Sequence, residues 1–275
     1  MTLSFLPEAK AVADEALAES APSWDVLAIR YGTRMATRGT VYVDPDEPDA
    51  PLGMDYFFWL LRGDADTVLV DTGFDPVVGE RRGRTTLCPP LTALARLGVA
   101  HDEIDVLAIT HLHYDHTGNV RHVQSRELAV QSRDLDFWQV DGLAPEHALH
   151  VEADEVRSVA TARRVRRLHG EAALAPGIGA VLVGGHSPGQ MALVVKGRGR
   201  PVLLTSDAIH YYEELERRLP FAIYTDLDEM AAGYDLLEQL AEHAGAVLVP
   251  GHDPEVMERF PPASEELAGL AIRLS

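Results

Sequence analysis

Cysteine is almost absent from this sequence: its 275 residues contain one, Cys88, which stands directly before two prolines. No intramolecular disulfide can form, so a zinc site in this chain has to use histidine and carboxylate ligands. Basic residues are also scarce, with 24 Lys and Arg against 43 Asp and Glu, which gives a formal charge of -19. Such a charge disfavours nucleic acids and anionic membrane surfaces as partners.

Long apolar runs are missing as well. The longest strongly apolar stretches, such as YFFWLL at 56–61, are far shorter than a membrane span requires. The N-terminus lacks the basic segment and long apolar run of a secretory signal, and its Ala- and Glu-rich composition predicts a helical extension over 1–23. We therefore expect a cytoplasmic protein without a membrane partner, and the sequence is compatible with a homo-oligomer.

Short runs rich in Val, Ile, Leu and aromatic residues recur along the chain and predict buried strands. They are DVLAI at 25–29, YFFWLL at 56–61, TVLV at 67–70, DVLAIT at 105–110, AVLV at 180–183, MALVV at 191–195, PVLL at 201–204 and AVLV at 246–249. Helical patterns lie at 89–98, at about 155–168 and at 228–245. This mixture predicts an α/β or α+β fold.

No segment has the composition of a linker between domains, so we predict a single domain over 1–275. The stretch at about 121–178 resembles a strand and helix insertion within that domain. Its basic segment RRVRR at 163–167 is interpreted as the solvated face of a helix rather than as a binding patch.

The two halves of the chain share one order of elements. YFFWLLRGDADTVLVD forms a predicted hairpin that ends at Asp71, and after a helix the strand VLAIT leads to His111. MALVVKGRGRPVLLTSD and AVLVP repeat this order and lead to Asp207 and His252. The aspartates are 136 residues apart and the histidines 141, which suggests two similar halves with facing sheets. The alternative is that any α/β chain contains hairpins and helices.

The segment THLHYDHTGN places four candidate metal ligands directly after a predicted strand: His111, His113, Asp115 and His116. In an extended backbone, side chains two positions apart point the same way, so the first two histidines can bind one metal ion. The last two ligands follow the turn and can face a second ion. A polar loop that is merely rich in histidine is the alternative interpretation.

Three more candidate ligands follow other predicted strands. AVLVGGHSPGQ supplies His186, PVLLTSDAIH supplies Asp207, and AVLVPGHDP supplies His252. A single histidine at a strand end is usually a hydrogen-bonded structural residue. Together with the HLHYDH segment, however, these residues indicate a site with two metal ions, which a carboxylate between two imidazole clusters can bridge.

THLHYDHTGN, GGHSPGQ, SDAIH and PGHDP, in this order and at these separations, resemble the motifs of the metallo-β-lactamase superfamily over roughly residues 54–256. The resemblance implies a four-layer αββα sandwich with metal ions at one edge of two facing sheets. It implies that His111, His113 and His186 hold the first metal, that Asp115, His116 and His252 hold the second, and that Asp207 bridges them. Asp71 would support a ligand, and Asp115 would carry a proton.

Within the superfamily, the stretches from DYFFWLL to THLHYDHTGN and from SDAIHYYEE to PGHDP resemble the N-acyl homoserine lactonase group. In that group a tyrosine commonly stands three residues after the bridging aspartate and helps to bind the lactone carbonyl. This chain has His210 there, followed by Tyr211 and Tyr212. His210 is either a catalytic donor or proton-transfer group, or a packed histidine behind the site. The tyrosines either bind substrate or pack within a lid segment.

We therefore expect a binuclear, metal-dependent hydrolase that opens acyl-homoserine or other small lactones through attack by metal-bound hydroxide. Zinc is the expected metal, and such ligand sets also take iron, manganese or cobalt. The alternatives are a thioester hydrolase of the glyoxalase II type or another acyl or ester hydrolase, and a non-catalytic binding module. The remaining histidines are expected on the surface or on helices: 101, 122, 147, 150, 169 and 243.

Overall fold

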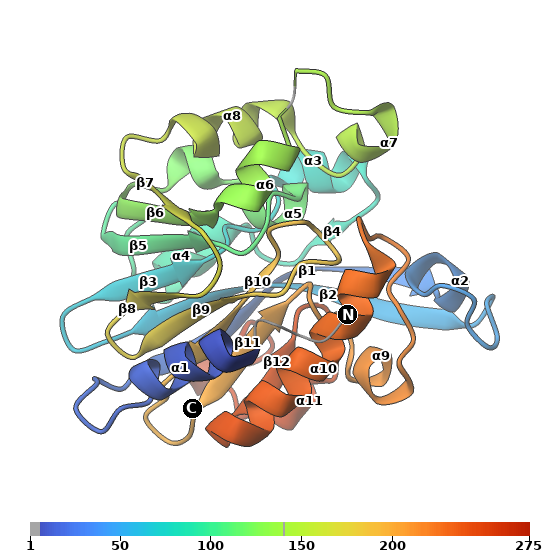
Figure 1. Ribbon diagram of the computed structural model, residues 1–275. Coiled ribbons are helices and arrows are strands. Elements are labelled where there is room, and N and C mark those ends of the chain that lie inside the picture. The colour runs from blue at the N-terminus through green and yellow to red at the C-terminus, as the bar shows by residue number, and fades with distance from the viewer. Residues whose placement is uncertain (1–5, 140) are drawn as a thin grey trace.

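The computed structural model describes residues 6–139 and 141–275, with helices packed on both outer faces of two sheets (Figure 1). The helices are α1 (Leu6–Ala16), α2 (Arg38–Val41), α3 (Pro76–Arg81), α4 (Pro90–Arg96), α5 (Tyr114–Thr117), α6 (Ser132–Phe137), α7 (Pro145–Ala148), α8 (Ala153–Thr161), α9 (Tyr212–Arg217), α10 (Leu227–Ala244) and α11 (Val256–Arg259), with 3-10 turns η1 (Val120–His122) and η2 (Glu265–Leu267).

The strands are β1 (Asp25–Thr37), β2 (Pro51–Arg62), β3 (Thr67–Val70), β4 (Thr85–Thr86), β5 (Ile104–Ile109), β6 (Ser125–Gln131), β7 (Val165–Leu168), β8 (Ala172–Ala175), β9 (Ile178–Leu182), β10 (Met191–Val195), β11 (Val202–Ser206), β12 (Val247–Pro250) and β13 (Ala271–Arg273). The first sheet has the order β13-β1-β2-β3-β5-β6-β7, with β4 paired to β1. The second has the order β12-β11-β10-β9-β8. This arrangement is the αββα sandwich expected from the sequence.

The repeated order of elements predicted from the sequence is present in both sheets. In the first, β2 pairs antiparallel with β3, which pairs parallel with β5. In the second, β10 pairs antiparallel with β11, which pairs parallel with β12. Parallel neighbours end at the same edge of a sheet, so residues that follow β5, β11 and β12 are brought to one side of the molecule.

The hydrophobic core has two parts, one between the two sheets and one between the sheets and the outer elements, and alternate residues of a strand belong to different parts. Trp59 of β2 packs with residues of β10 and β11 in the cluster between the sheets. Its neighbours Phe58 and Leu60 belong to the cluster that packs against the outer elements. Because successive side chains of a strand point to opposite faces, a strand buried on both faces is apolar throughout, as YFFWLL is.

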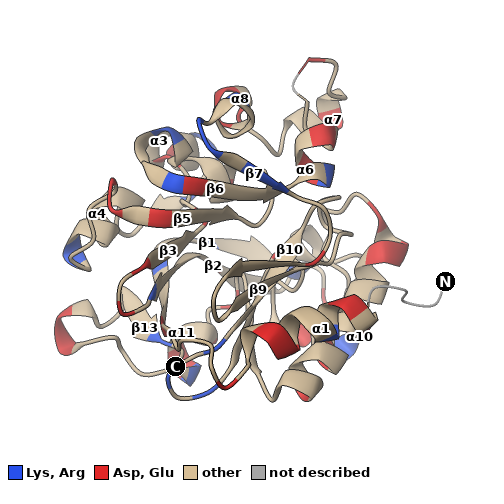
Figure 2. Cartoon of the chain, turned by 60° about the vertical axis from the view of Figure 1, so that its left-hand side comes forward, with Lys and Arg blue, Asp and Glu red and all other residues tan. Residues whose placement is uncertain are grey.

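The segment at 121–178 extends both sheets: β6 and β7 lengthen the first, and β8 lengthens the second. The helix predicted at about 155–168 is wrong in its second half, because α8 ends at Thr161 and Val165–Leu168 form β7, paired parallel with β6. RRVRR is therefore a turn and an edge strand rather than a helix face, and its arginines colour β7 blue in Figure 2. The bounds of the single domain and of this insertion stay predictions.

Of the helical extension predicted over 1–23, residues 1–5 lie outside the described residues, α1 covers Leu6–Ala16, and residues 17–23 are not helical. The helix α1 packs through Ala9 and Ala13 on the second sheet beside α10 (Figure 1). The described side chain of Val12 leaves no room for a Cβ at Gly179 of β9, so the helix lies directly on the strand. In the described part of the chain, no helix combines the length and the apolar character that crossing a membrane requires.

Candidate metal centre

The loop after β5 carries four of the candidate ligands. His111 follows the buried strand, and the short helix α5 directs Asp115 and His116 to the same side. All of them are buried, and the imidazole centroids of His111 lie 4.5 Å from His113 and 4.1 Å from His116. The loop packs closely on the preceding chain, because a Cβ at Gly118 would lie 2.4 Å from the backbone nitrogen of Asp75.

The other three candidate ligands come from three separate strand ends of the second sheet. His186 follows β9 after Gly184 and Gly185, which both have positive φ angles. Asp207 follows β11, whose last residue, Ser206, has a φ of 47°. His252 follows β12. The three ligands therefore lie at the edge of the sandwich where β5 also ends.

Asp207 lies at the centre of the group. Its Oδ2 is 3.4 Å from Nε2 of His186, 3.1 Å from Nε2 of His252 and 3.9 Å from Nε2 of His111. Its Oδ1 is 3.2 Å from Nε2 of His116.

The remaining two ligands complete the group. Nε2 of His186 lies 3.0 Å from Nδ1 of His113, and Oδ2 of Asp115 lies 3.9 Å from Nε2 of His252. Donor atoms close enough to share an ion form several sets, among them His111, His113 and His186; His111, His116 and Asp207; and Asp115, His116 and His252. The structure thus brings together all seven residues expected as ligands.

In most of these histidines, the ring nitrogen that points away from the centre contacts a polar group of the surrounding chain. Nδ1 of His186 meets the carbonyl of Ile223 at 2.8 Å, and Nδ1 of His252 meets the carbonyl of Asp55 at 2.8 Å. Nδ1 of His116 lies 2.7 Å from Oδ2 of Asp71. A carbonyl or carboxylate on one ring nitrogen fixes the tautomer and leaves the other nitrogen as a metal donor.

Several ring nitrogens of the group have no hydrogen-bond partner. Nε2 of His111, His113 and His116 is buried and makes no hydrogen bond, whereas Nδ1 of His113 is the nitrogen that faces His186. Burial, followed by the neighbouring imidazoles, lowers the pKa of His111, His113 and His186 well below the ordinary value. Neutral imidazoles whose lone pairs converge are what a metal ion requires, so this set of donors fits metal binding.

The carboxylate among them stays ionised. Burial opposes the charge of Asp207, but His252, His116 and His210 outweigh burial and hold its pKa well below the ordinary value. Burial also opposes a charge on His116, yet Asp207, Asp71 and Asp115 raise the pKa of that imidazole well above its ordinary value. These acids stabilise a positive charge at Nε2 of His116, whether a proton or a metal ion carries it.

Asp71 lies behind the group of ligands rather than in it. It accepts hydrogen bonds at 2.8 Å from the backbone nitrogen and the hydroxyl of Thr110, in addition to its contact with His116. The hydroxyl of Thr110 also lies 2.9 Å from that of Ser206. Asp71 therefore orients His116, and Thr110 connects the edges of the two sheets.

Asp134 is a structural residue that the sequence gave no reason to select. Its fully buried carboxylate accepts hydrogen bonds from the backbone nitrogens of Leu112 and Gly189 and from the hydroxyl of Ser187, at 2.7, 2.5 and 2.6 Å. It thus ties the His113 loop to the His186 loop. No motif surrounds Asp134 in the sequence, and only the pairing of β6 with β5 brings it to this edge.

His210 lies against the group of ligands and is fully buried. Its Nε2 is 3.3 Å from Oδ2 of Asp207 and makes no hydrogen bond. Its Nδ1 is 3.1 Å from Oε2 of Glu214, and its ring stacks on Phe221 at a centroid distance of 3.5 Å. Donor atoms of His186, Asp207 and His210 are also close enough to share one ion.

The two tyrosines after His210 contact other parts of the chain. The hydroxyl of Tyr211 donates to the carbonyl of Gly53 at 3.1 Å, and its ring packs edge-on against Tyr42. The backbone nitrogen of Tyr212 donates to Asp253, and Arg259 lies 3.5 Å above the tyrosine ring. The structure therefore buries both rings in packing contacts.

One histidine expected on the surface or on a helix lies beside the site. His150 is half-buried, and its ring centroid is 5.3 Å from that of His113. The carbonyl of His150 accepts a hydrogen bond from the backbone nitrogen of Tyr114. This bond connects the 121–178 segment to the loop that carries His111 to His116. His147 is half-buried against Phe137 and Trp138. The other four histidines of that set are exposed: 101, 122, 169 and 243.

Comparison with protein families finds the metallo-beta-lactamase superfamily over residues 55–252. Among curated proteins, the chain is 27% identical over 261 residues to the N-acyl homoserine lactonase AiiB of Agrobacterium fabrum, covering 84% of this chain and 92% of that protein. It is 25% identical over 223 residues to the N-acyl homoserine lactonase AiiA of Bacillus thuringiensis subsp. kurstaki, covering 76% of this chain and 85% of that protein.

Solved structures share the fold. A quorum-quenching N-acyl homoserine lactone lactonase superposes with a TM-score of 0.72 at 24% identity, covering 86% of this chain and 94% of the other. AidC, a dizinc quorum-quenching lactonase, superposes with a TM-score of 0.69 at 17% identity, covering 86% and 91%. The family model spans most of the described fold and all seven candidate ligands, and this chain therefore belongs to the metallo-beta-lactamase superfamily.

Proposed function

We propose that this chain is a binuclear lactonase that hydrolyses the ring ester of acyl-homoserine or other small lactones. That it is a metal-dependent enzyme of ester hydrolysis follows from its family and its lactonase relatives. The two-metal mechanism and the substrate are the proposed parts. One observation carries the proposal: four of the ligand imidazoles lie within 3.9 Å of the carboxylate of Asp207, and the two remaining ligands, His113 and Asp115, lie against His186 and His252.

In this proposal, His111, His113 and His186 hold one divalent ion, Asp115, His116 and His252 hold the other, and Asp207 bridges them. Zinc is the expected metal, and iron, manganese and cobalt suit the same ligands. When bound, such a pair of ions lowers the pKa of water and polarises a carbonyl group. Five imidazoles and two carboxylates leave two bound dications with a net positive charge, which favours both effects.

Asp115 is the proposed proton carrier. With 8% of its surface exposed, it is the most accessible of the seven ligands, whereas His111 is not exposed at all. A carboxylate that reaches both the centre and solvent can take a proton from the attacking water and return it to the alkoxide that leaves when the ring opens. The hydroxyl of Tyr31 donates to the carbonyl of Asp115 at 2.8 Å and holds this residue in place.

His210 is the second proposed catalytic residue. It occupies the position where lactonases of this group commonly have a tyrosine, and its Nε2 faces Asp207. Tyr211 and Tyr212 are proposed substrate-binding residues, and their side chains also make packing contacts within the chain.

Lactones are the proposed substrates because the curated relatives that cover most of this chain are N-acyl homoserine lactonases. A thioester hydrolase of the glyoxalase II type, or another acyl hydrolase, would use the same centre. The burial of so many polar groups argues against a non-catalytic module, because without ions their desolvation would be uncompensated. The cytoplasmic location and a homo-oligomer stay predictions.

The test is a direct comparison of substrates. Purified chain loaded with zinc is assayed on an acyl-homoserine lactone, a simple lactone, a glutathione thioester, a cephalosporin and a phosphodiester. The highest kcat/KM is expected on a lactone. Highest turnover of another substrate would overturn the proposed substrate, and metal-loaded chain without turnover of any would favour the binding module.

A matched pair of variants tests the ligands. His113→Ala is expected to lose one metal ion and about a thousandfold or more in kcat/KM, because it removes a buried donor. His101→Ala removes an exposed histidine and should leave metal content and turnover unchanged. Full metal content and activity in His113→Ala would contradict the assignment.

A further inference from the structure

His210 differs from the other residues behind the metal centre because its ring aims an unpartnered nitrogen at Asp207. The side chain is fully buried, and stacking on Phe221 with an interplanar angle of 10° fixes the plane of its ring. Nε2 lies 3.3 Å from Oδ2 of Asp207 and has no hydrogen-bond partner. This nitrogen is therefore placed where a ligand of the metal centre would be.

Glu214 contacts the other nitrogen of the His210 ring, Nδ1. Its Oε2 accepts a hydrogen bond from the backbone nitrogen of His210 at 2.6 Å, and its Oε1 accepts one from the hydroxyl of Tyr234 at 2.7 Å. Nδ1 of His210 lies 3.1 Å from the same Oε2. A carboxylate that faces this many donors acts as an acceptor, so Nδ1 carries a hydrogen and Nε2 is the ring nitrogen that faces Asp207.

Nε2 of His210 and Oδ2 of Asp207 lie 3.3 Å apart, close enough for both atoms to contact one metal ion. His111 and His116 present the same arrangement, with Nδ1 held from behind and Nε2 without a partner. His186, Asp207 and His210 can share one ion.

We infer that His210 is an additional ligand of the metal ion held by His186 and Asp207. The inference deepens the proposed function and rests on it. It gives the centre eight protein ligands instead of seven, and a carboxylate, Glu214, orients the eighth. An imidazole in place of a tyrosine hydroxyl would occupy a coordination position that is otherwise open to substrate or water.

The test measures metal binding without substrate. His210→Ala and His210→Gln are compared with Tyr211→Phe, which removes a neighbouring buried hydroxyl that is no candidate ligand. In competition with a chelator, both His210 variants are expected to lose at least about tenfold in affinity for one of the two zinc ions, while Tyr211→Phe keeps both. Circular dichroism identifies any variant that fails to fold. If His210→Ala does not fold, His210→Gln, whose side chain has a similar length, still provides the test.

Cobalt supplies a second readout. Five-coordinate Co²⁺ absorbs visible light more weakly than four-coordinate Co²⁺, so loss of the extra ligand should strengthen the absorption of the cobalt-loaded His210→Ala chain. Unchanged affinity and an unchanged cobalt spectrum in both His210 variants would overturn the inference and assign Nε2 a proton instead. Neither measurement depends on lactone turnover, so failure of the proposed function would be seen separately.

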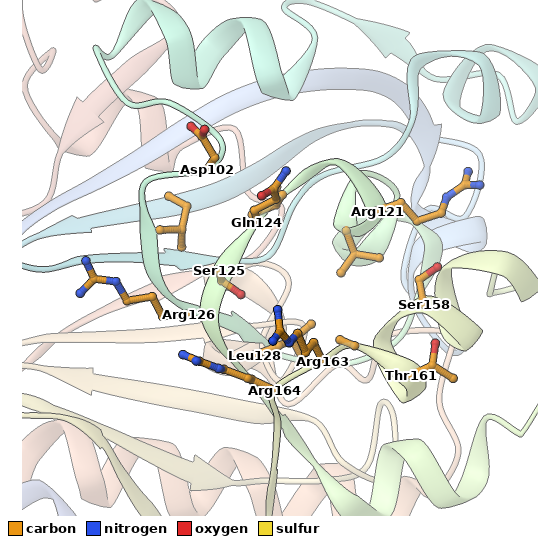
Figure 3. Close-up of a pocket in the computed structure, with 14 residues that line it drawn as sticks. Asp102, Arg121, Gln124, Ser125, Arg126, Leu128, Ser158, Thr161, Arg163 and Arg164 are labelled. Carbon is orange, nitrogen blue, oxygen red and sulfur yellow. The ribbon is translucent and has the colours of Figure 1, made fainter.

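A second site lies at the opposite edge of the first sheet. A hollow of about 650 Å³ opens at the N-terminal ends of the parallel strands β5, β6 and β7, between these ends and α8 (Figure 3). The metal ligands follow the C-terminal ends of β5, β9, β11 and β12, so the hollow and the metal centre are separate.

The hollow gathers four arginines in a chain whose charge is -19. Two of them are neutralised: Arg121 pairs with Glu155 at 2.7 Å, and Arg126 pairs with Asp105 at 2.8 Å. Arg163 and Arg164 are adjacent, and among the described residues neither makes an ion pair, a side-chain hydrogen bond or a contact with an aromatic ring. An anion bound in the hollow would give both guanidinium groups a partner of opposite charge.

The floor of the hollow is apolar, built from the buried side chains of Ile104, Val120, Val123 and Leu128. Guanidinium groups bind carboxylate or phosphate in a two-pronged geometry, and an apolar floor favours a ligand with a hydrocarbon part. We propose that this hollow binds an organic anion with a carboxylate or phosphate head and an apolar body, held by Arg163 and Arg164. RRVRR thus contains a binding pair followed by two arginines that pair with Glu127 and Asp136.

Calorimetric titration tests this site with three probes: octyl phosphate, octanoate and inorganic phosphate. Binding of an octyl probe is expected to weaken at least about tenfold in Arg163→Gln/Arg164→Gln, because both head-group contacts are lost. The control, Arg166→Gln/Arg167→Gln, removes the same charge from arginines that already have acidic partners and should change affinity less than about threefold. Lactone turnover without probe should be unchanged in both.

The better octyl probe identifies the head group. Tightest binding by inorganic phosphate would show that the apolar floor contributes nothing and would overturn the proposed ligand class. Equal affinity in the two double variants, or no saturable binding to the unaltered chain at millimolar probe, would overturn the site.

Discussion

The two halves of the molecule contribute to the metal centre in different ways. The first half supplies four ligands from one loop of six residues after β5. The second supplies single ligands from three strand ends: His186, Asp207 and His252. A compact motif can be recognised as a metal site from the sequence alone. Ligands that are far apart in the sequence can be recognised only when the fold brings them together.

The pairing of strands also explains why Asp71 and Asp207 differ. Trp59 pairs with Val70 in the first half and Leu193 pairs with Leu204 in the second, so equivalent residues lie 134 positions apart. The aspartates are 136 apart, and the register of β11 shifts after Leu204. Two extra positions carry Asp207 into the centre, while Asp71 stays behind His116.

The largest effect is expected when the bridging carboxylate is removed. Asp207→Ala should lose both metal ions and at least about a thousandfold in kcat/KM, because the carboxylate of this residue lies within reach of five imidazoles. Elemental analysis and lactone kinetics measure the two losses. Retention of two tightly bound ions would show that Asp207 does not bridge them.

Asp71→Asn, at the counterpart position in the first half, should have a milder effect. It weakens the support of His116 without removing a ligand, so metal affinity should fall about 10- to 100-fold while two ions still bind at saturation. Zinc titration against a chelator measures the change. A loss as large as that of Asp207→Ala would mean that the two aspartates have equivalent roles.

A smaller, structural effect is expected at the turn that positions His186. Gly185 has a φ of 79°, and a Cβ there would lie 2.5 Å from backbone atoms of Met230. Gly185→Ala should therefore lower the free energy of unfolding by about 2 to 4 kcal/mol, from strain and overlap together.

Gly83→Ala is the matched control, because Gly83 has a similar φ of 72° but no atom near the added Cβ. Only the strain remains, so this change should cost about 1 kcal/mol. Chemical denaturation compares the two. Equal losses would show that the approach of Met230 is unimportant.

A pH-dependent effect is expected at Asp134, whose hydrogen bonds connect the ligand loops of the two halves. Burial raises the pKa of Asp134 from 3.8 to about 6. The contribution to stability is therefore present below pH 4 and lost as the pH rises through 6. Relative to Asp134→Asn, the unaltered chain should lose on the order of 2 kcal/mol of unfolding free energy between pH 4 and pH 7.

Unfolding titrations of both proteins at several pH values measure this difference. A difference that grows with pH would mean that the three hydrogen bonds to the Asp134 carboxylate stabilise its charge more than burial opposes it.

Much of this account could be predicted from local sequence. The apolar runs at 67–70 and 191–195 coincide with β3 and β10, because fully buried strands are apolar and short. The ligand set could be predicted because metal chemistry restricts residue type and because each ligand follows such a run.

Other features depend on contacts that the sequence does not display. RRVRR has a polar composition that resembles a solvated helix, yet it spans a turn and the first residues of β7, and only pairing with β6 makes that second part a strand. Asp134 and His150 stand in no motif, and they reach the centre through β6 and through the return of the 121–178 segment. Long-range packing, rather than local preference, decides such positions.

Zinc titration of chain stripped by a chelator tests the central claim most directly. Lactone turnover should be absent at the start and should rise to a plateau at two zinc ions per chain, with both ions lost when Asp207 is replaced by alanine. Full turnover by the stripped chain, or a plateau that is already reached at one ion, would contradict a centre built from two metal ions and a bridging carboxylate.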